Sequence, residues 1–345
     1  MSTTCRISFL LVALLGILGS GASWATKRAL IIGIDAYQHQ PTLSGSVNDA
    51  TIMADLLRGW YGFEDKDTVR LVDGQATHAA IKAAMSALVA ETQKSDIVVL
   101  HLSGHGATVK VNDEYHEAFV PYDGILSKPE TLLTSSDLRN WFSNLRTPLV
   151  YVILDHCYAA GMGRALPGPH DPAVKISMGE RRFAGGETEN VPLANEPATR
   201  GGVCMIYASN SRVAVHDLTI TLSNGSVIKA GGLTYALYRS LYENPNQSPS
   251  STVKNTVDKL RSWGVPQQPG ARGLPLRGPI FGGPRKGVGP CCLPIVRHAN
   301  GKYQLIGGSA LSLANGTRVD CVDEQGNRVP GQTVTQVELW RSWVR

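Results

Sequence analysis

The chain has 345 residues, of which 43% are hydrophobic, and it carries a formal net charge of +5. This length and apolar content are enough for one sizeable α/β domain with a smaller addition. The small positive excess is not gathered into runs of Lys and Arg, so the composition argues against a nucleic-acid partner.

Residues 1–25 have the composition of an export signal. Arg6 is the only charged residue, an apolar core extends from residue 7 to residue 18, and small residues lead up to Ala25. This order predicts a secretory signal peptide cut after Ala25, with an uncleaved signal anchor as the alternative. We expect an exported protein, periplasmic or secreted, without a stable membrane anchor once the signal is removed.

Strand and helix patterns alternate through the next part of the chain. Short apolar runs predict buried strands, and apolar positions spaced three and four residues apart predict helices. The predicted strands are residues 28–34, 68–72, 96–102, 149–154 and 203–208, and the predicted helices are residues 47–59, 77–91 (with Thr77 as cap), 135–145, 232–243 and 251–263. The alternation predicts an α/β fold with a doubly wound, mostly parallel sheet and helices on both faces.

The remaining segments lack this alternation. Residues 164–200 are rich in Gly, Pro and charged residues, which predicts a mobile surface loop, and residues 267–290 predict a wrapping coil. Residues 286–345 contain short β-like runs with Asn-Gly turn signals, so we expect a small C-terminal β-rich appendage. The predicted organisation is therefore a signal at 1–25, a main domain at 26–285 and the appendage at 286–345.

The ends of two predicted strands carry the residues of chemical interest. Strand 96–102 runs into Ser103, His105 and Gly106, and strand 149–154 runs into Asp155 and Cys157. In open α/β sheets ligands lie at the carboxyl ends of the strands, so these two ends can bring an imidazole and a thiol together. A thiolate attacks, and an imidazole takes its proton and passes it to a leaving group. Alone, Cys157 fits a small buried hydrophobe and His105 a loop residue, but the pair favours a nucleophile with its acid–base partner.

Five segments resemble those of caspase-like cysteine peptidases, and among these the metacaspases and their bacterial relatives. They are RALIIGIDAY (28–37), LSGSVNDA (43–50), LSGHG (102–106), ILDHCYAAG (153–161) and GGLTYALYRSL (231–241). The Asp-His-Cys order ending at Cys157 is the metacaspase form, whereas caspases carry Gln-Ala-Cys there. The resemblance implies a caspase-like fold and a cysteine endopeptidase that uses His105 and Cys157 as a catalytic dyad. Together with the predicted signal peptide, it predicts a secreted enzyme.

The resemblance also implies roles for neighbouring residues. The backbone N–H groups of Gly106 and Cys157 would hold the oxyanion. Asp49, Ser103 and Asp155 match the family's primary specificity pocket, which implies a peptide or protein substrate with Arg or Lys before the cleaved bond. The alternative for Asp155 is orientation of the histidine, and the alternative for Asp49 is a favourable charge at a helix start.

Calcium is the one cofactor that the resemblance brings in, because many metacaspases bind it. The candidate oxygen ligands are Asp113, Glu114, Glu117 and Asp123. The family's paired acidic residues appear here as Ser135-Ser136, with Asp137 as the nearest carboxylate, so a solvated acidic loop is the preferred interpretation. No His/Cys spacing indicates a zinc site.

The other cysteines and the loop at 164–200 leave further questions open. Cys204, Cys291, Cys292 and Cys321 allow two disulfides in an oxidising compartment, in three pairings, or remain buried thiols. Self-cleavage after Lys175, Arg181 or Arg182 is a further hypothesis for the loop. The alternative to an enzyme is a catalytically silent caspase-fold scaffold or binding protein.

Overall fold

The structure is a computed structural model that describes residues 25–112, 114–157, 174–181, 183–186, 203–208, 215–222, 225, 227–267, 269–272, 278–290, 292–298, 301–308, 313–338 and 340–345. The predicted signal peptide lies outside these residues, apart from Ala25. Within the described part of the chain, no helix combines the length and the apolar character needed to span a membrane.

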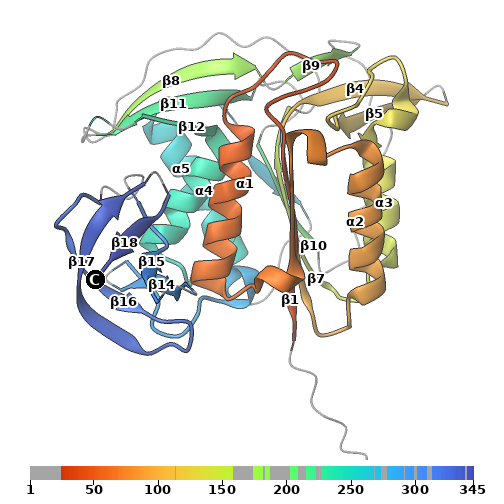
Figure 1. Ribbon diagram of the computed structural model, residues 1–345. Helices are drawn as coiled ribbons and strands as arrows, with labels where there is room; N and C mark the ends of the chain where they lie inside the picture. Colours follow the sequence, from red (N-terminus) through yellow and green to blue (C-terminus); the bar gives the residue numbers. More distant parts are fainter. Residues whose placement is uncertain are drawn as a thin grey trace, which may run out of the picture.

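A six-stranded sheet forms the centre of the molecule, in the order β13-β10-β7-β3-β1-β2 (Figure 1). Its strands are β1 (Lys27–Gly33), β2 (Thr68–Val72), β3 (Ile97–Ser103), β7 (Leu149–Asp155), β10 (Val203–Tyr207) and β13 (Gly270–Arg272). All neighbours are parallel except β13, which runs antiparallel to β10. The first five strands coincide closely with the predicted ones. Four of them are mainly apolar runs buried between two helical layers, and the fifth, β2, is the partly exposed edge strand.

Helices cover both faces of this sheet (Figure 1). α1 (Ser46–Asp55), α4 (Gly232–Glu243) and α5 (Pro249–Ser262) lie on one face, and α2 (His78–Glu91) and α3 (Ser135–Asn144) lie on the other. Successive side chains of a strand point to opposite faces. In β1, Ala29 and Ile31 therefore pack with the first helical group, and Leu30 and Ile32 pack with the second. The predicted doubly wound architecture is confirmed.

Two smaller sheets lie above the carboxyl edge of the central sheet (Figure 1). One has the order β6-β5-β4-β9, and the other has the order β12-β11-β8. The strands are β4 (Gly106–Val111), β5 (Glu114–Phe119), β6 (Leu133–Thr134), β8 (Val174–Arg181), β9 (Phe183–Gly186), β11 (His216–Leu222) and β12 (Val227–Gly231).

The prediction that residues 164–200 form a loop is wrong where β8 and β9 lie, because these residues form strands. β8 pairs antiparallel with β11, so Lys175 lies opposite Thr221 and Arg181 lies opposite His216. β9 pairs with β4. These strands depend on partners far away in the sequence, and the Gly-rich composition of the segment hides them from a local pattern. Arg182 and the rest of residues 164–200 lie outside the described part.

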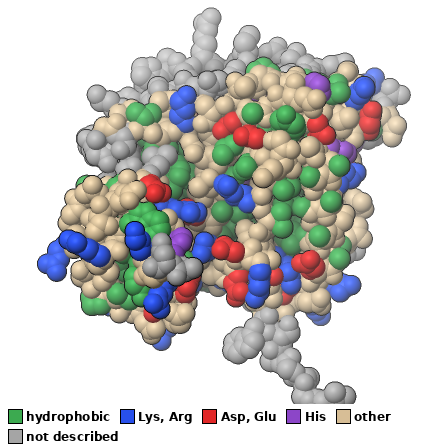
Figure 2. Space-filling view, in the orientation of Figure 1, with side chains coloured by type: hydrophobic (Ala, Val, Ile, Leu, Met, Phe, Trp, Pro, Cys, Tyr) green, Lys and Arg blue, Asp and Glu red, His purple; other side chains and the backbone are tan. Residues whose placement is uncertain are grey.

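The C-terminal region closes into a small barrel in the order β14-β15-β18-β17-β16. Its strands are β14 (Leu293–Arg297), β15 (Tyr303–Leu305), β16 (Arg318–Val322), β17 (Arg328–Val337) and β18 (Ser342–Val344). Figure 2 shows several Lys and Arg side chains over this part of the surface. The barrel is attached to the main domain by Arg341, which forms hydrogen bonds with the buried carboxylate of Asp55 from α1, and by Ile306, which packs against Gly59.

A partly buried lysine fixes the segment that leads to the barrel. Lys27 Nζ donates hydrogen bonds to the carbonyl oxygens of Tyr61 (2.7 Å) and Gly283 (3.2 Å). Burial lowers the pKa of Lys27 to about 8, because the charged form loses hydration. The ammonium group therefore links two distant segments at a desolvation cost.

Candidate active site

The carboxyl ends of β3 and β7 bring the predicted dyad to one place. The two strands are parallel neighbours, and Ser103 pairs with Asp155 in the register. His105 and Cys157 each follow two residues later. The backbone N–H of Gly104 donates to the carbonyl oxygen of Asp155 at 3.4 Å, so the two chains stay adjacent beyond the last paired residues.

His105 is held by contacts to both its backbone and its ring. Its N–H donates to the hydroxyl of Tyr37 at 2.8 Å, and the two rings lie 4.8 Å apart between centroids. Nε2 lies 2.9 Å from the carbonyl oxygen of Pro41. A carbonyl oxygen only accepts, so this contact requires the proton on Nε2 and makes Nδ1 the basic nitrogen of the neutral ring.

Cys157 is 3% exposed, and its sulfur contacts the residue that directly precedes β11. The backbone N–H of Val215, which directly precedes β11, donates to Sγ at 3.1 Å. The carbonyl oxygen of Val215 lies 3.6 Å from the same sulfur, so the backbone of one residue holds the thiol in place on both sides.

Gly106 allows the two strand ends to meet. A Cβ at this position would lie 1.7 Å from the carbonyl oxygen of Cys157 and 2.7 Å from Nδ1 of His156. The same His156 nitrogen lies 3.1 Å from the Cys157 oxygen. Any side chain at position 106 would therefore push the histidine strand away from the cysteine strand.

The three residues predicted for substrate recognition form one buried cluster. Asp49 and Asp155 are 0% exposed. Ser103 Oγ donates to Asp49 Oδ2 at 2.7 Å, and the N–H of Gly231 donates to Asp49 Oδ1 at 2.8 Å. Asp155 Oδ2 accepts from both the N–H and the hydroxyl of Thr234, each at 2.8 Å. The strand ends, α1 and the start of α4 thus converge on two carboxylates.

The two carboxylates are close neighbours. A Cβ built on Gly231 would lie 2.3 Å from Asp155 Oδ2 and 2.6 Å from Asp49 Oδ2. The two oxygens therefore lie within about 5 Å of each other, a distance at which like charges repel strongly and a cation between them is favoured. Asp155 is also tied to the start of α4, because its Oδ2 accepts the two hydrogen bonds from Thr234.

Several residues of the site act through groups that the sequence does not reveal. Pro41 and Val215 contribute a carbonyl and an N–H, which every residue type carries. Tyr37 and Thr234 lie inside two of the matched segments, but their types alone indicate no role. Nε2 of His101 contacts the Thr234 hydroxyl at 3.1 Å, deep in the core.

The carboxylates considered for calcium have other partners or lie apart. Asp113 and the Glu114 side chain lie outside the described residues. Asp123 accepts from the N–H of His78 at 2.7 Å, and Asp137 caps α3 and pairs with Lys82 at 3.5 Å. Among the described residues, no group of three or more His, Cys, Asp or Glu could hold a metal ion. Two of the four candidate ligands thus lie outside the described residues, and Glu117 lies on β5, opposite Thr108.

Two of the remaining cysteines belong to the core. Cys204 and Cys321 are buried thiols that form no disulfide within the described part of the chain, and Cys291 lies outside the described residues. Burial raises the pKa of Cys204 and of Cys321 to about 12. These two thiols behave as small core residues, in contrast to Cys157 with its N–H donor.

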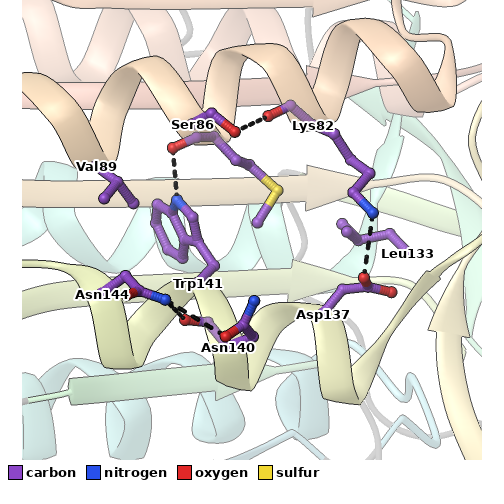
Figure 3. A pocket seen from close by; sticks show the side chains of 9 residues that line it. Lys82, Ser86, Val89, Leu133, Asp137, Asn140, Trp141 and Asn144 are labelled. Atoms are coloured by element: carbon purple, nitrogen blue, oxygen red, sulfur yellow. Dashed lines mark hydrogen bonds and ion pairs between the residues drawn. The ribbon is translucent and has the colours of Figure 1, made fainter.

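A separate pocket of about 260 Å³ lies between α2 and α3 (Figure 3). Met85, Leu133 and Trp141 give it an apolar floor, and polar side chains such as Lys82 and Asn140 form its rim. None of the residues that line it belongs to the dyad or to the acidic cluster.

An α/β sheet with a histidine and a cysteine at adjacent strand ends is the arrangement of a caspase-like cysteine peptidase. A family model described as the caspase domain matches residues 26–275. The chain therefore belongs to the caspase-domain family.

Within this family, the chain is similar to metacaspases. It is 33% identical over 275 residues to Metacaspase-1A of Aspergillus terreus, a match that covers 68% of this chain and 67% of that protein. It is 37% identical over 113 residues to Metacaspase III c of Phaeodactylum tricornutum, covering 30% and 34%. Several other metacaspases match over only 25% to 38% of their own length. The structure of Caspase-1 from Spodoptera frugiperda matches with a TM-score of 0.47 and 10% identity, over 75% of this chain and 90% of that one.

Proposed function

We propose that the protein is a cysteine endopeptidase that cleaves peptide bonds after Arg or Lys. The observation that carries the proposal is the meeting of His105 and Cys157 beside a buried pair of carboxylates, Asp49 and Asp155. The family membership supports the chemistry, and the carboxylate pair supports the choice of substrate.

In the proposed reaction, Nδ1 of His105 takes the proton from Cys157, and the thiolate attacks the carbonyl carbon of the scissile bond. The N–H groups of Gly106 and Cys157 stabilise the oxyanion that develops. His105 then gives the proton to the leaving amine, while its Nε2–H stays bonded to Pro41. Water hydrolyses the resulting thioester and regenerates the thiol.

The carboxylate pair explains the proposed preference for a basic residue. Two buried negative charges this close destabilise each other, and a guanidinium or ammonium placed between them removes that repulsion. Ser103 and Thr234 orient the two carboxylates through their hydroxyl groups. An uncharged substrate side chain would leave the repulsion in place.

Replacement of the nucleophile tests the proposal. The Cys157→Ala variant should stay folded and should not hydrolyse Arg- or Lys-amide peptides. Cys204→Ala is the matched control, because Cys204 is a buried thiol on the neighbouring strand and should keep its activity. Wild-type hydrolysis by Cys157→Ala would reject the assignment.

We also propose that the protein is exported and that its signal is cut after Ala25. The N–H of Thr26 donates to the buried Asp96 carboxylate at 3.0 Å. Cleavage after Ala25 would convert this N–H into a charged ammonium beside that carboxylate, which strengthens the hydrogen bond. Mass spectrometry of the exported protein should show Thr26 as the first residue, and a retained N-terminal segment would contradict the proposal.

Self-cleavage after Lys175, Arg181 or Arg182 remains a proposal of its own. Lys175 and Arg181 lie in β8, so cutting after either residue requires the strand to leave its partner β11. Termini found in wild-type protein and absent from Cys157→Ala protein would support self-cleavage. An intact, active wild-type protein would exclude it.

A further inference from the structure

A carboxylate outside the matched segments holds the loop that leads into α1. Asp217 lies on β11 and is 1% exposed. Its Oδ2 accepts from the N–H groups of Ser44 (2.7 Å) and Gly45 (3.1 Å). A Cβ at Gly45 would lie 2.7 Å from Asp217 Oδ1 and 2.9 Å from the carbonyl carbon of Ala230, so the loop packs directly onto Asp217 and β12.

The loop that Asp217 holds also positions the histidine. Pro41 precedes Ser44 by only three residues, and its carbonyl oxygen accepts from Nε2 of His105 at 2.9 Å. Between them, the N–H of Leu43 donates to the carbonyl oxygen of Asp35 at 2.8 Å. Movement of Ser44 and Gly45 would therefore move the carbonyl group that fixes the tautomer and orientation of His105.

The segment that carries Asp217 contacts the cysteine as well. Val215 lies two residues before Asp217, is 0% exposed and donates its N–H to Cys157 Sγ at 3.1 Å. One short segment thus contacts the thiol at Val215 and the histidine-orienting loop at Asp217.

We propose that Asp217 is a positioning residue for the dyad. By accepting two loop N–H groups it fixes Pro41 against His105, and through the same segment it keeps Val215 on Cys157. This role rests on the proposed peptidase function, but the alignment of imidazole and thiol can be measured without any substrate.

The test compares Asp217→Ala, which removes the oxygen that accepts both loop N–H groups, with the wild type in two assays. The first is the pH dependence of the alkylation of Cys157 by iodoacetamide, followed by mass spectrometry of the peptide that contains Cys157. We expect the midpoint to move by about half a pH unit or more, because thiolate formation depends on the imidazole and on the N–H donor. The second is hydrolysis of an Arg-amide peptide, for which we expect a kcat lower by at least about tenfold and a KM within about twofold.

Two further variants make the result decisive. Asp96→Ala is the matched control: Asp96 is also 1% exposed and accepts backbone N–H groups, but it lies at the opposite edge of the sheet, so neither assay should change. Gly45→Ala places a methyl group against Asp217 and should shift the same midpoint, which covers the case in which Asp217→Ala does not fold.

The outcomes separate this role from others. An unchanged alkylation midpoint in the folded Asp217 variant, or in Gly45→Ala if the Asp217 variant does not fold, would overturn the proposal. A raised KM with an unchanged kcat would overturn it too, since Asp217 would then bind substrate. If the wild type hydrolyses no Arg-amide peptide, the proposed peptidase function fails, but the alkylation profile still decides the positioning role.

Discussion

Replacement of Asp155 by Asn removes one charge from the carboxylate pair and changes little else. The Asn side chain has nearly the same shape, and its oxygen can still accept from the N–H and the hydroxyl of Thr234. Asp49 then remains as the single charge that faces the substrate side chain. The variant therefore tests the charge of the pocket separately from its packing.

The expected size of the effect follows from burial of the site. Asp155 is 0% exposed, so its contact with a cationic substrate is shielded from water. Loss of a charged hydrogen-bond partner in such a site costs about 1.5–3 kcal/mol, which corresponds to roughly 10- to 150-fold in kcat/KM. A substrate with a neutral side chain of the same shape should lose little.

The assay compares two peptide amides that differ only in Arg or citrulline before the cleaved bond. Citrulline keeps the size of arginine and removes the charge. We expect Asp155→Asn to lower kcat/KM for the Arg peptide selectively, and Asp96→Asn at the opposite edge of the sheet to leave the ratio unchanged. Equal losses for both peptides would refute the proposal that the two carboxylates bind a cationic side chain, and would favour a role for Asp155 in orienting the dyad.

Three other substitutions follow from specific contacts. Gly106→Ala should abolish hydrolysis, because the added Cβ would lie 1.7 Å from the Cys157 carbonyl oxygen; near-normal kcat/KM would contradict the close approach. Burial lowers the pKa of Lys27 from 10.5 to about 8. Between these two pH values the unfolded state binds more protons than the folded state. Lys27 therefore makes the free energy of unfolding rise with pH in this range, by up to about 3 kcal/mol. Denaturant unfolding at pH 7.5 and 10.5 should show that Lys27→Met lacks this contribution, and equal pH dependence in both proteins would contradict it. Arg341→Met should cost about 2 kcal/mol of stability by leaving Asp55 buried without this partner, and adding Asp55→Asn should recover much of it; additive losses would contradict a coupled pair.

The central sheet could be predicted because its strands carry their own signal. Residues 149–154 form an unbroken apolar run, since the strand is covered by helices on both faces and every position from Val150 to Leu154 is buried. The helix predicted at 232–243 coincides with α4, which is buried along most of its length. In these segments, burial alone determines the pattern.

The two upper sheets could not be predicted in the same way. β8 and β9 pair with β11 and β4, which lie far away in the sequence, and β9 contains two glycines. The sequence of β8 does alternate, with Val174, Ile176 and Met178 between polar or small residues, but an alternation does not show which strand it pairs with or in what register.

The residues of the site likewise differ in whether the sequence could indicate them. His105, Cys157, Asp49 and Asp155 carry reactive or charged groups, so their types drew attention in the sequence. The carbonyl of Pro41 and the N–H of Val215 are backbone groups, and only the folded chain shows where they point. Asp217 carries a carboxylate, but it lies outside the matched segments, so the sequence did not single it out.

The most direct measurement is covalent labelling of Cys157 by a peptidyl-arginine chloromethyl ketone at neutral pH, followed by mass spectrometry. We expect modification of Cys157 in the wild type, much slower modification by the citrulline analogue, and almost no modification in His105→Ala. Labelling of other cysteines in place of Cys157, or labelling that is equally fast without His105, would contradict the claim that these two residues form a dyad beside an acidic pocket that binds a cationic side chain.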